Sequence, residues 1–302
     1  MPNNFAYLAL ILWPIFAISL YRRKEIIPAT FWTIVGGYLL LPVGVDIDFP
    51  LIPSLNKDTI PAIMAFLGCK YIAKENVKIL PPKGIERNLI LLLFLGAVGT
   101  VLTNGDPIDE SGRYLPGLSY RDVFSVVMAK LLLLLPFTLG IQLIKTSEDQ
   151  IQLLKLIVLA GLLYSVLIIF EIRMSPQLHK WIYGFFPHTW GQQVRYGGFR
   201  PVVFLGHGLW VSIFIVIVIG AALPLSKLKI KLSKPPNLVV IIYLVLLLIL
   251  SKGFGSILLA AVILITVGLF KPRIIYLVST LIALVSITYP FLCFIDIINK
   301  RP

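Results

Sequence analysis

Ten apolar segments fill most of this 302-residue chain and constrain its fold more than any other feature. A helix of about 20 apolar residues crosses the hydrocarbon core of a bilayer, and several segments reach that length. Only 14% of the residues are charged, whereas soluble domains carry roughly 25%. The sequence therefore predicts an all-α polytopic membrane protein with a single transmembrane domain over residues 1–302. The ten expected helices are at about 5–21, 27–44, 59–73, 88–103, 122–143, 153–171, 201–224, 237–251, 256–270 and 274–294, the third, eighth and ninth being short for a full crossing.

Basic residues are concentrated in alternate loops between these segments. One set of loops holds sixteen Lys and Arg residues against five acidic residues, whereas the other set holds ten against nine. Because cytoplasmic loops are enriched in Lys and Arg, we expect the first set in the cytoplasm and both chain ends outside. Most of the net charge of +13 then reflects this topology and contact with anionic lipid, so we expect a lipid bilayer and no nucleic acid as partner.

The exterior loop at residues 172–200 runs against this charge trend. It reads IRMSPQLHKWIYGFFPHTWGQQVRYGGFR, with four basic residues, two histidines and no acidic residue. A positive loop on the outer face favours an anionic ligand there. Aromatic residues alternate with the charges, and SPQLHKWIYGFF is typical of a short interfacial helix begun by Ser175 and Pro176. For the aromatic residues, an ordinary belt at the membrane surface is the alternative interpretation.

The end of this loop, RYGGFRP at residues 195–201, combines cations with a flexible backbone. Gly197 and Gly198 permit a tight turn and the close approach of a ligand. Pro201 is expected to begin the seventh helix, at the position that proline prefers. A helix amino terminus beside the guanidinium groups of Arg195 and Arg200 suits a phosphate or diphosphate.

Over most of residues 90–270 the sequence resembles the O-antigen ligase and Wzy-type polysaccharide polymerase superfamily. It resembles most the O-antigen-ligase-like membrane proteins of exopolysaccharide clusters. Arg195 and Gly206 are separated by ten residues, similar to the spacing in Wzy-type periplasmic loops. The matching stretches are PGLS (116–119) before a Leu-rich segment, SPQLH (175–179), R-x-GG-x-RP (195–201) and the Ser-Lys-Gly element at 251–253.

This resemblance implies a GT-C-like fold in the bacterial inner membrane, with the active face in the periplasm. The implied reaction moves a glycan from undecaprenyl diphosphate to an acceptor glycan or lipid, as a polymerase or a ligase. Family members continue beyond about ten helices into a further periplasmic loop. We therefore expect this chain to be a carboxy-terminally truncated form, with polysaccharide-export proteins as candidate partners.

Such a reaction needs cations for the departing diphosphate and at most one general base. Arg195, Arg200 and His207 are expected to be catalytic, with His207, about two turns into the seventh helix, or His179 as the base. No cofactor and no metal are expected, because neither Cys69 nor Cys293 lies in a metal-binding spacing. The acidic pair at residues 46 and 48 fits a solvated turn better than a metal site. The residues expected to bind substrate are Arg173, His179, Lys180, Gln192, Gly197, Gly198 and Lys252.

Three points stay open from the sequence. Lys130, inside the fifth segment, either snorkels to the outer surface or pairs with Glu171 or a phosphate. A transporter or flippase of lipid-linked oligosaccharide would use similar cations, although the internal repeats common in transporters are not found. A non-catalytic subunit of a polysaccharide export complex would fit a chain that lacks part of the site.

Overall fold

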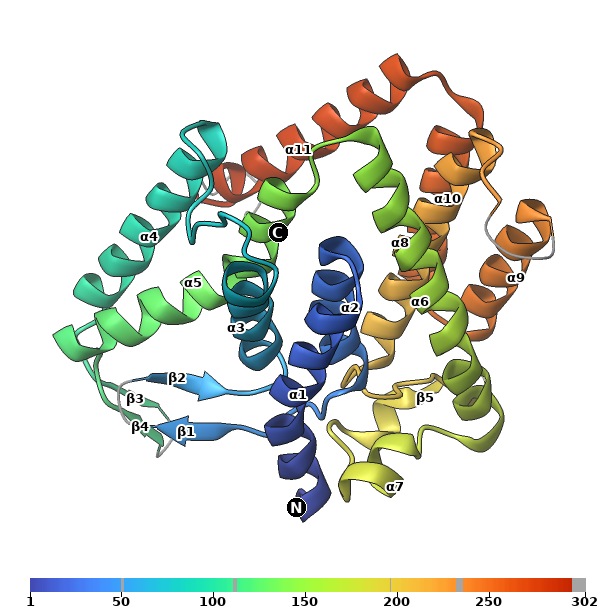
Figure 1. The fold of residues 1–302 in the computed structure, drawn as a ribbon. Helices are drawn as coiled ribbons and strands as arrows, with labels where there is room; N and C mark the ends of the chain where they lie inside the picture. Colours follow the sequence, from blue (N-terminus) through green and yellow to red (C-terminus); the bar gives the residue numbers. More distant parts are fainter. Residues whose placement is uncertain (50–51, 111–112, 196, 232–235, 295–302) are drawn as a thin grey trace.

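The computed structural model describes residues 1–49, 52–110, 113–195, 197–231 and 236–294, and it is mostly helical (Figure 1). Three antiparallel hairpins connect helices: β1 (Ile47–Phe49) with β2 (Ile52–Leu55), β3 (Ile108–Glu110) with β4 (Arg113–Leu115), and β5 (Val194–Arg195) with β6 (Gly198–Phe199). The helices are α1 (Asn4–Arg23), α2 (Ile26–Leu40), α3 (Thr59–Leu67) with a π-helical turn (Gly68–Ile72), α4 (Ile85–Thr103), α5 (Tyr120–Leu143), α6 (Ser147–Met174), α7 (Leu178–Tyr183), α8 (Gly208–Lys227), α9 (Asn237–Leu250), α10 (Phe254–Leu269) and α11 (Pro272–Phe294).

Each of the ten expected segments contains a helix. Within the described residues, six helices are long and apolar enough to span a membrane, namely α1, α4, α5, α6, α8 and α11. Helices α2, α9 and α10, and α3 together with its π-helical turn, are also apolar but shorter. The all-helical membrane class is therefore confirmed, whereas a count of ten crossings and a GT-C-like arrangement stay predictions.

The loops that were expected outside share one end of the molecule. Figure 1 shows the three hairpins, α7 and the amino terminus together at the lower end of the helices. The connections from α5 to α6 and from α10 to α11, which carry basic residues, lie at the opposite end. We call the end with the three hairpins and α7 the hairpin end. The short helix expected after Pro176 is present there as α7, and its place in the membrane interface stays a prediction.

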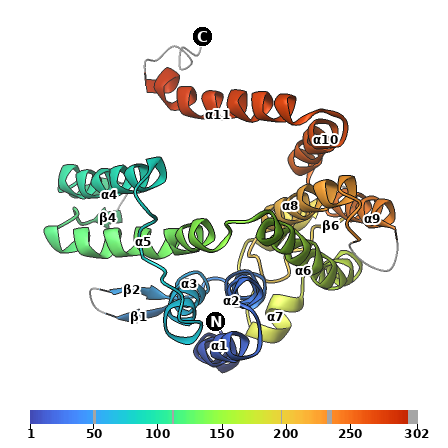
Figure 2. The same cartoon turned by 45° about the horizontal axis from the view of Figure 1, so that its top comes forward.

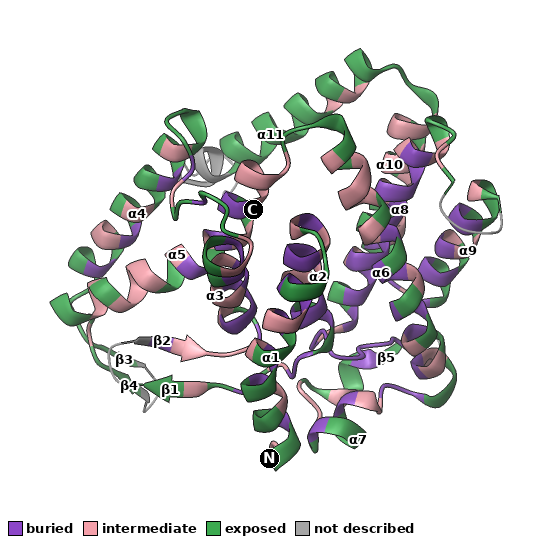
Figure 3. Ribbon diagram, viewed as in Figure 1, coloured by how far each residue is buried: buried purple, intermediate pink, exposed green. Residues whose placement is uncertain are grey.

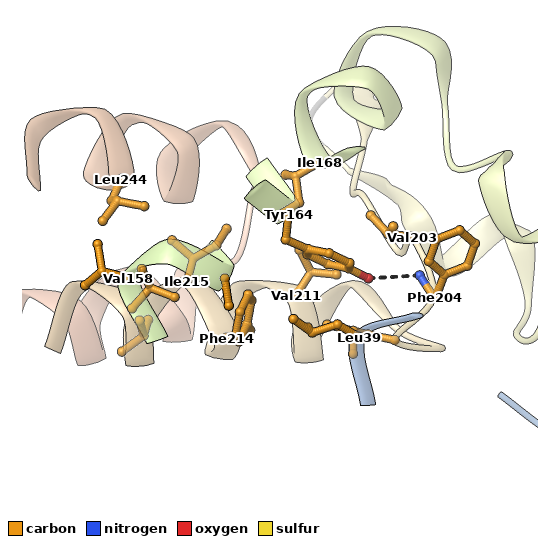
Figure 4. Packing of buried hydrophobic residues seen from close by; sticks show 14 of the residues in the cluster. Leu39, Val158, Tyr164, Ile168, Val203, Phe204, Val211, Phe214, Ile215 and Leu244 are labelled. Atoms are coloured by element: carbon orange, nitrogen blue, oxygen red, sulfur yellow. Dashed lines mark hydrogen bonds between the residues drawn. The ribbon is translucent and has the colours of Figure 1, made fainter. Parts of the chain in front are cut away.

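The main core lies around α6 and α8, with α2, α9 and α10 packed against them (Figures 3 and 4). Tyr164 of α6 meets Phe214 of α8 edge to face, with ring centroids 5.8 Å apart. The two helices approach closely because Gly161 has no side chain: a Cβ there would lie 2.5 Å from both methyl groups of Val218. Small residues commonly permit such contacts between membrane helices.

Helices α4 and α11 contribute little to this core. Most of their described residues are exposed in Figure 3, and the described part of α11 has no buried residue. Figure 2 shows α11 extending from α10 away from the other helices. Their exposed faces are apolar, which in a bilayer means contact with lipid rather than with water.

The expected helix at 201–224 begins seven residues late. Helix α8 starts at Gly208, so Pro201 is not its first residue and that prediction is wrong. Residues 201–207 form an irregular stretch, which we call the 201–207 segment, and all but His207 are buried. Val203 in this segment has a φ of +51°, a left-handed conformation that costs free energy for a β-branched residue.

Polar side chains of α6 explain why the 201–207 segment is not helical. One carboxylate oxygen of Glu171 accepts the backbone N–H groups of Val202 and Val203, at 2.8 and 2.7 Å. The Tyr164 hydroxyl accepts the N–H of Phe204 at 3.1 Å, as Figure 4 shows. Irregular backbone at membrane depth is tolerated only where protein satisfies its hydrogen bonds, and α6 provides the acceptors.

Candidate functional site

The RYGGFR stretch forms the β5–β6 hairpin, in which Val194 pairs with Phe199 and Arg195 with Gly198. The turn contains Gly197, whose φ of +69° is the left-handed conformation that glycine adopts without cost. Residue 196, the other turn residue, lies outside the described residues. The tight turn expected from the glycine pair is therefore present, and it brings the backbone of Arg195 beside that of Gly198.

Arg200 follows this hairpin and is buried. Its side chain is only 5% exposed, and its Nε has no hydrogen-bond partner. Burial lowers the pKa of Arg200, and the neighbouring charge of Arg195 lowers it further. Within the described part of the chain, no carboxylate lies within ion-pair distance of Arg200. A buried cation in this condition is costly unless an anion binds beside it.

Gln193 is a second buried donor at the same place. Its side chain is fully buried, its Oε1 accepts the Gly208 N–H at 3.4 Å, and its Nε2 has no partner. The main-chain carbonyl of Gln193 also accepts the N–H of Arg200 at 2.8 Å. Buried donors without acceptors are rare in folded proteins, so Gln193 and Arg200 together indicate a site for an acceptor-rich ligand. The sequence singled out the neighbouring Gln192, which is exposed.

Lys252 comes to this hairpin from the turn between α9 and α10. Its Nζ donates to the Arg195 carbonyl at 2.9 Å, and it lies where a side chain on Gly198 would be. The Ser-Lys-Gly element at 251–253 and the R-x-GG-x-RP stretch are thus neighbours in space. Glycine is needed at position 198 because a Cβ there would collide with the Lys252 ammonium group.

Replacing Gly198 with valine is expected to displace Lys252 while leaving the fold intact, because the collision is with the end of a flexible side chain. Loss of this cation should weaken the binding of inorganic diphosphate about tenfold, the worth of one charge-assisted hydrogen bond. Titration calorimetry of the purified protein measures the effect. Gly191→Val is the matched control, since a Cβ at Gly191 meets open space. Equal affinities in the two variants would remove Lys252 from the site.

His207 does not lie two turns into a helix, as was expected, but is the N-cap of α8. Its Nδ1 accepts the N–H of Leu209 at 3.0 Å, so the neutral ring carries its proton on Nε2. Its ring lies 4.7 Å from that of His188. Burial lowers the pKa of His207, and His188, Arg200 and Arg195 lower it further. Near neutral pH His207 is thus a hydrogen-bond donor among cations.

His179 is buried and fully engaged by backbone. It is 1% exposed, its Nδ1 donates to the Phe185 carbonyl at 2.8 Å, and its Nε2 accepts the N–H of Val43 at 3.3 Å. Burial lowers its pKa. With both ring nitrogens occupied, His179 joins α7 to the loop after α2 and offers no free nitrogen to a substrate.

The other expected site residues make no hydrogen bond or ion pair with this group among the described residues, and their assignment to the substrate stays a prediction. Arg173, at the last turn of α6, and Lys180, on α7, are exposed. Lys130 is also exposed on α5, and Glu171 is used by backbone N–H groups, so the two do not pair. The structure brings together the set that we call the cationic cluster: Arg195, Arg200, Lys252, His188 and His207, with Gln193 beneath it.

In the described part of the chain, no group of three or more His, Cys, Asp or Glu side chains is placed to hold a metal ion. Cys69 is buried as a free thiol, and the side chain of Cys293 lies outside the described residues.

Comparison of the chain with protein-family models, with curated proteins and with solved structures finds no match. The resemblance to the polysaccharide ligase and polymerase superfamily therefore rests on the sequence motifs alone.

Proposed function

We propose that the protein is a membrane glycosyltransferase of the O-antigen ligase and polymerase type, working without a metal ion. It would move a glycan from undecaprenyl diphosphate to an acceptor glycan or lipid at the periplasmic face of a bacterial inner membrane. The observation that carries this proposal is the cationic cluster at the hairpin end, built over the buried unpaired donors of Arg200 and Gln193. The sequence motifs supply the reaction class, and the cluster supplies the chemistry that this class needs.

In the proposed reaction the bond between the anomeric carbon and the diphosphate oxygen breaks, and its electron pair stays on the diphosphate. The acceptor hydroxyl oxygen forms the new bond to the anomeric carbon. Arg200, Arg195 and Lys252 stabilise the negative charge that develops on the leaving group, and their effect is strong because the site is partly buried. The neutral His207 ring adds an Nε2 donor, so the hydroxyl proton passes to the diphosphate or to solvent.

The test is glycan output from a host that lacks its own copy and is complemented with Arg195→Ala. The expected result is loss of polymer, with lipid-linked units accumulating on the outer leaflet. Arg173→Ala is the control, because Arg173 is exposed and lies outside the cluster. Both proteins are quantified in the membrane so that a loss of expression is recognised.

Other outcomes would reject this proposal. Accumulation of lipid-linked units on the inner leaflet would indicate a flippase, since translocation rather than transfer would have failed. Normal polymer output with Arg195→Ala would remove Arg195 from catalysis and leave it as an ordinary cation at the membrane surface. Arg195 belongs to β5, which lies toward the hairpin end of the helices (Figure 1), and a site at one end of the helices supports transfer over transport.

A further inference from the structure

A continuous apolar groove lies on the side of the molecule formed by α2, α3, α5 and the start of α6. It consists of two hollows, of about 250 and 260 Å³, that share Ile34, Val35 and Pro136 in their walls. Nearly all of the surface inside the groove is apolar. Ile27 and Gly140 also line the first hollow, and Tyr38, Lys57, Asp58 and Leu133 line the second.

The dimensions of this groove match one hydrocarbon chain. Along α2 the lining runs from Ile27 to Tyr38, about 16 Å at the rise of an α-helix. That is just over half of the roughly 30 Å hydrocarbon thickness of a bilayer. Leu133 at the rim is 65% exposed, so the groove opens sideways toward lipid.

A buried cation closes the groove at the hairpin end. The Lys57 side chain is only 6% exposed, its Nζ donates to the Phe204 carbonyl at 2.9 Å, and it lies 4.9 Å from the centre of the Tyr38 ring. An ammonium group has three donors, and Phe204 uses one of them. Within the described residues, no carboxylate lies within ion-pair distance of Lys57.

Lysine is seldom buried without a partner, because removing its charge from water is costly. Burial lowers the pKa of Lys57 to about 8, and nearby Asp58 opposes this shift. The group therefore stays mainly protonated at pH 7. A charge held this way, at the end of an apolar groove, is complementary to a lipid with an anionic headgroup.

We propose that this groove binds one acyl chain of an anionic phospholipid, with the headgroup phosphodiester accepting hydrogen bonds from Lys57. A phosphodiester carries one negative charge, which a single ammonium neutralises, and the proximity of Asp58 disfavours a doubly charged phosphate monoester. The existence of this site does not depend on the proposed glycan transfer. The site is linked to the cluster through the 201–207 segment, because Lys57 donates to the Phe204 carbonyl and His207 ends the same segment.

Native mass spectrometry of the purified protein with phosphatidylglycerol or phosphatidylcholine tests the headgroup contact. The wild-type protein is expected to retain phosphatidylglycerol preferentially. Lys57→Gln should reduce that preference about tenfold, the loss of one charge-assisted hydrogen bond. Lys130→Gln, which removes an exposed lysine, is the matched control and should keep the preference.

A second variant tests the groove itself and leaves Lys57 in place. At Gly140 a Cβ meets no atom within 4 Å, so Gly140→Leu should fill the first hollow without disturbing the helices. Retention of phosphatidylglycerol is expected to fall severalfold, whereas Gly99→Leu, at an equally open position on α4, should leave it unchanged.

Two results would overturn the proposal. One is a folded Lys57→Gln or Gly140→Leu protein that keeps the wild-type preference for phosphatidylglycerol. The other is retention of a polyprenyl phosphate in place of phosphatidylglycerol, because the groove would then hold a different class of lipid. Should Lys57→Gln fail to fold, Gly140→Leu decides the outcome alone.

Discussion

Replacing Glu171 with alanine is expected to lower the free energy of unfolding by at least about 3 kcal/mol. The Glu171 carboxylate accepts three backbone N–H groups, those of Leu178 at 3.0 Å, Val202 at 2.8 Å and Val203 at 2.7 Å. Each buried N–H left without an acceptor costs about 1–3 kcal/mol. Thermal unfolding of the purified protein in detergent, followed by circular dichroism, measures the loss.

Two variants calibrate this result. Glu171→Gln keeps one carbonyl oxygen, so its stability should lie between those of the wild type and the alanine variant. Glu148→Ala removes an exposed carboxylate from the first turn of α6 and should change stability by no more than about 0.5 kcal/mol. A wild-type unfolding temperature for Glu171→Ala would mean that the 201–207 segment is held in place by other contacts.

Replacing Arg200 with alanine is expected to reduce the rate of glycan transfer by about 10²–10³-fold, the usual effect of removing one preorganised donor to a developing charge. The fold should be unharmed or stabilised, since the substitution removes a buried cation that lacks a carboxylate partner in the described structure. Initial rates with a synthetic lipid-diphosphate donor, together with unfolding temperatures, measure both effects.

A loss of transfer rate without a loss of unfolding temperature would show that Arg200 has a functional role rather than a structural one. If Arg200 only stabilised the hairpin end, activity and unfolding temperature would fall together. Arg173→Ala should alter neither, because Arg173 is exposed on the last turn of α6. An Arg200→Ala protein with full activity would eliminate this residue from the proposed mechanism.

The positions of the helices could be predicted from the sequence because length and apolarity largely decide where a membrane helix forms. The late start of α8 could not. Nothing local in PVVFLGH opposes a helix after Pro201, and the opposing acceptor, Glu171, lies thirty residues earlier in the chain. Only the packing of α6 against the 201–207 segment brings that carboxylate to the backbone of Val202 and Val203.

The turn of the site could be predicted from the sequence, because glycine marks its backbone conformation. The buried side chains of the site could not, because their burial depends on tertiary packing. The paired glycines and flanking arginines indicated the turn at Gly197, and the motif placed Lys252 near it. The sequence could not distinguish Gln192 from Gln193, because adjacent glutamines look alike until the fold buries one of them. The structure buries Gln193 and leaves Gln192 exposed. The same limit applies to Lys57, which in the sequence is one more basic residue in a polar loop.

The irregular 201–207 segment also has a consequence for the order in which the protein is built. Its N–H groups find acceptors on Glu171 and Tyr164 of α6, so before the segment docks on α6 they have no such partners. In an empty bilayer the same residues would be driven to satisfy themselves as a helix. Residues 201–227 would then enter the membrane as one longer helix, whose first two turns unwind when it docks on α6. The cationic cluster then forms late in biogenesis, because Arg200 becomes buried only when the adjoining 201–207 segment docks on α6.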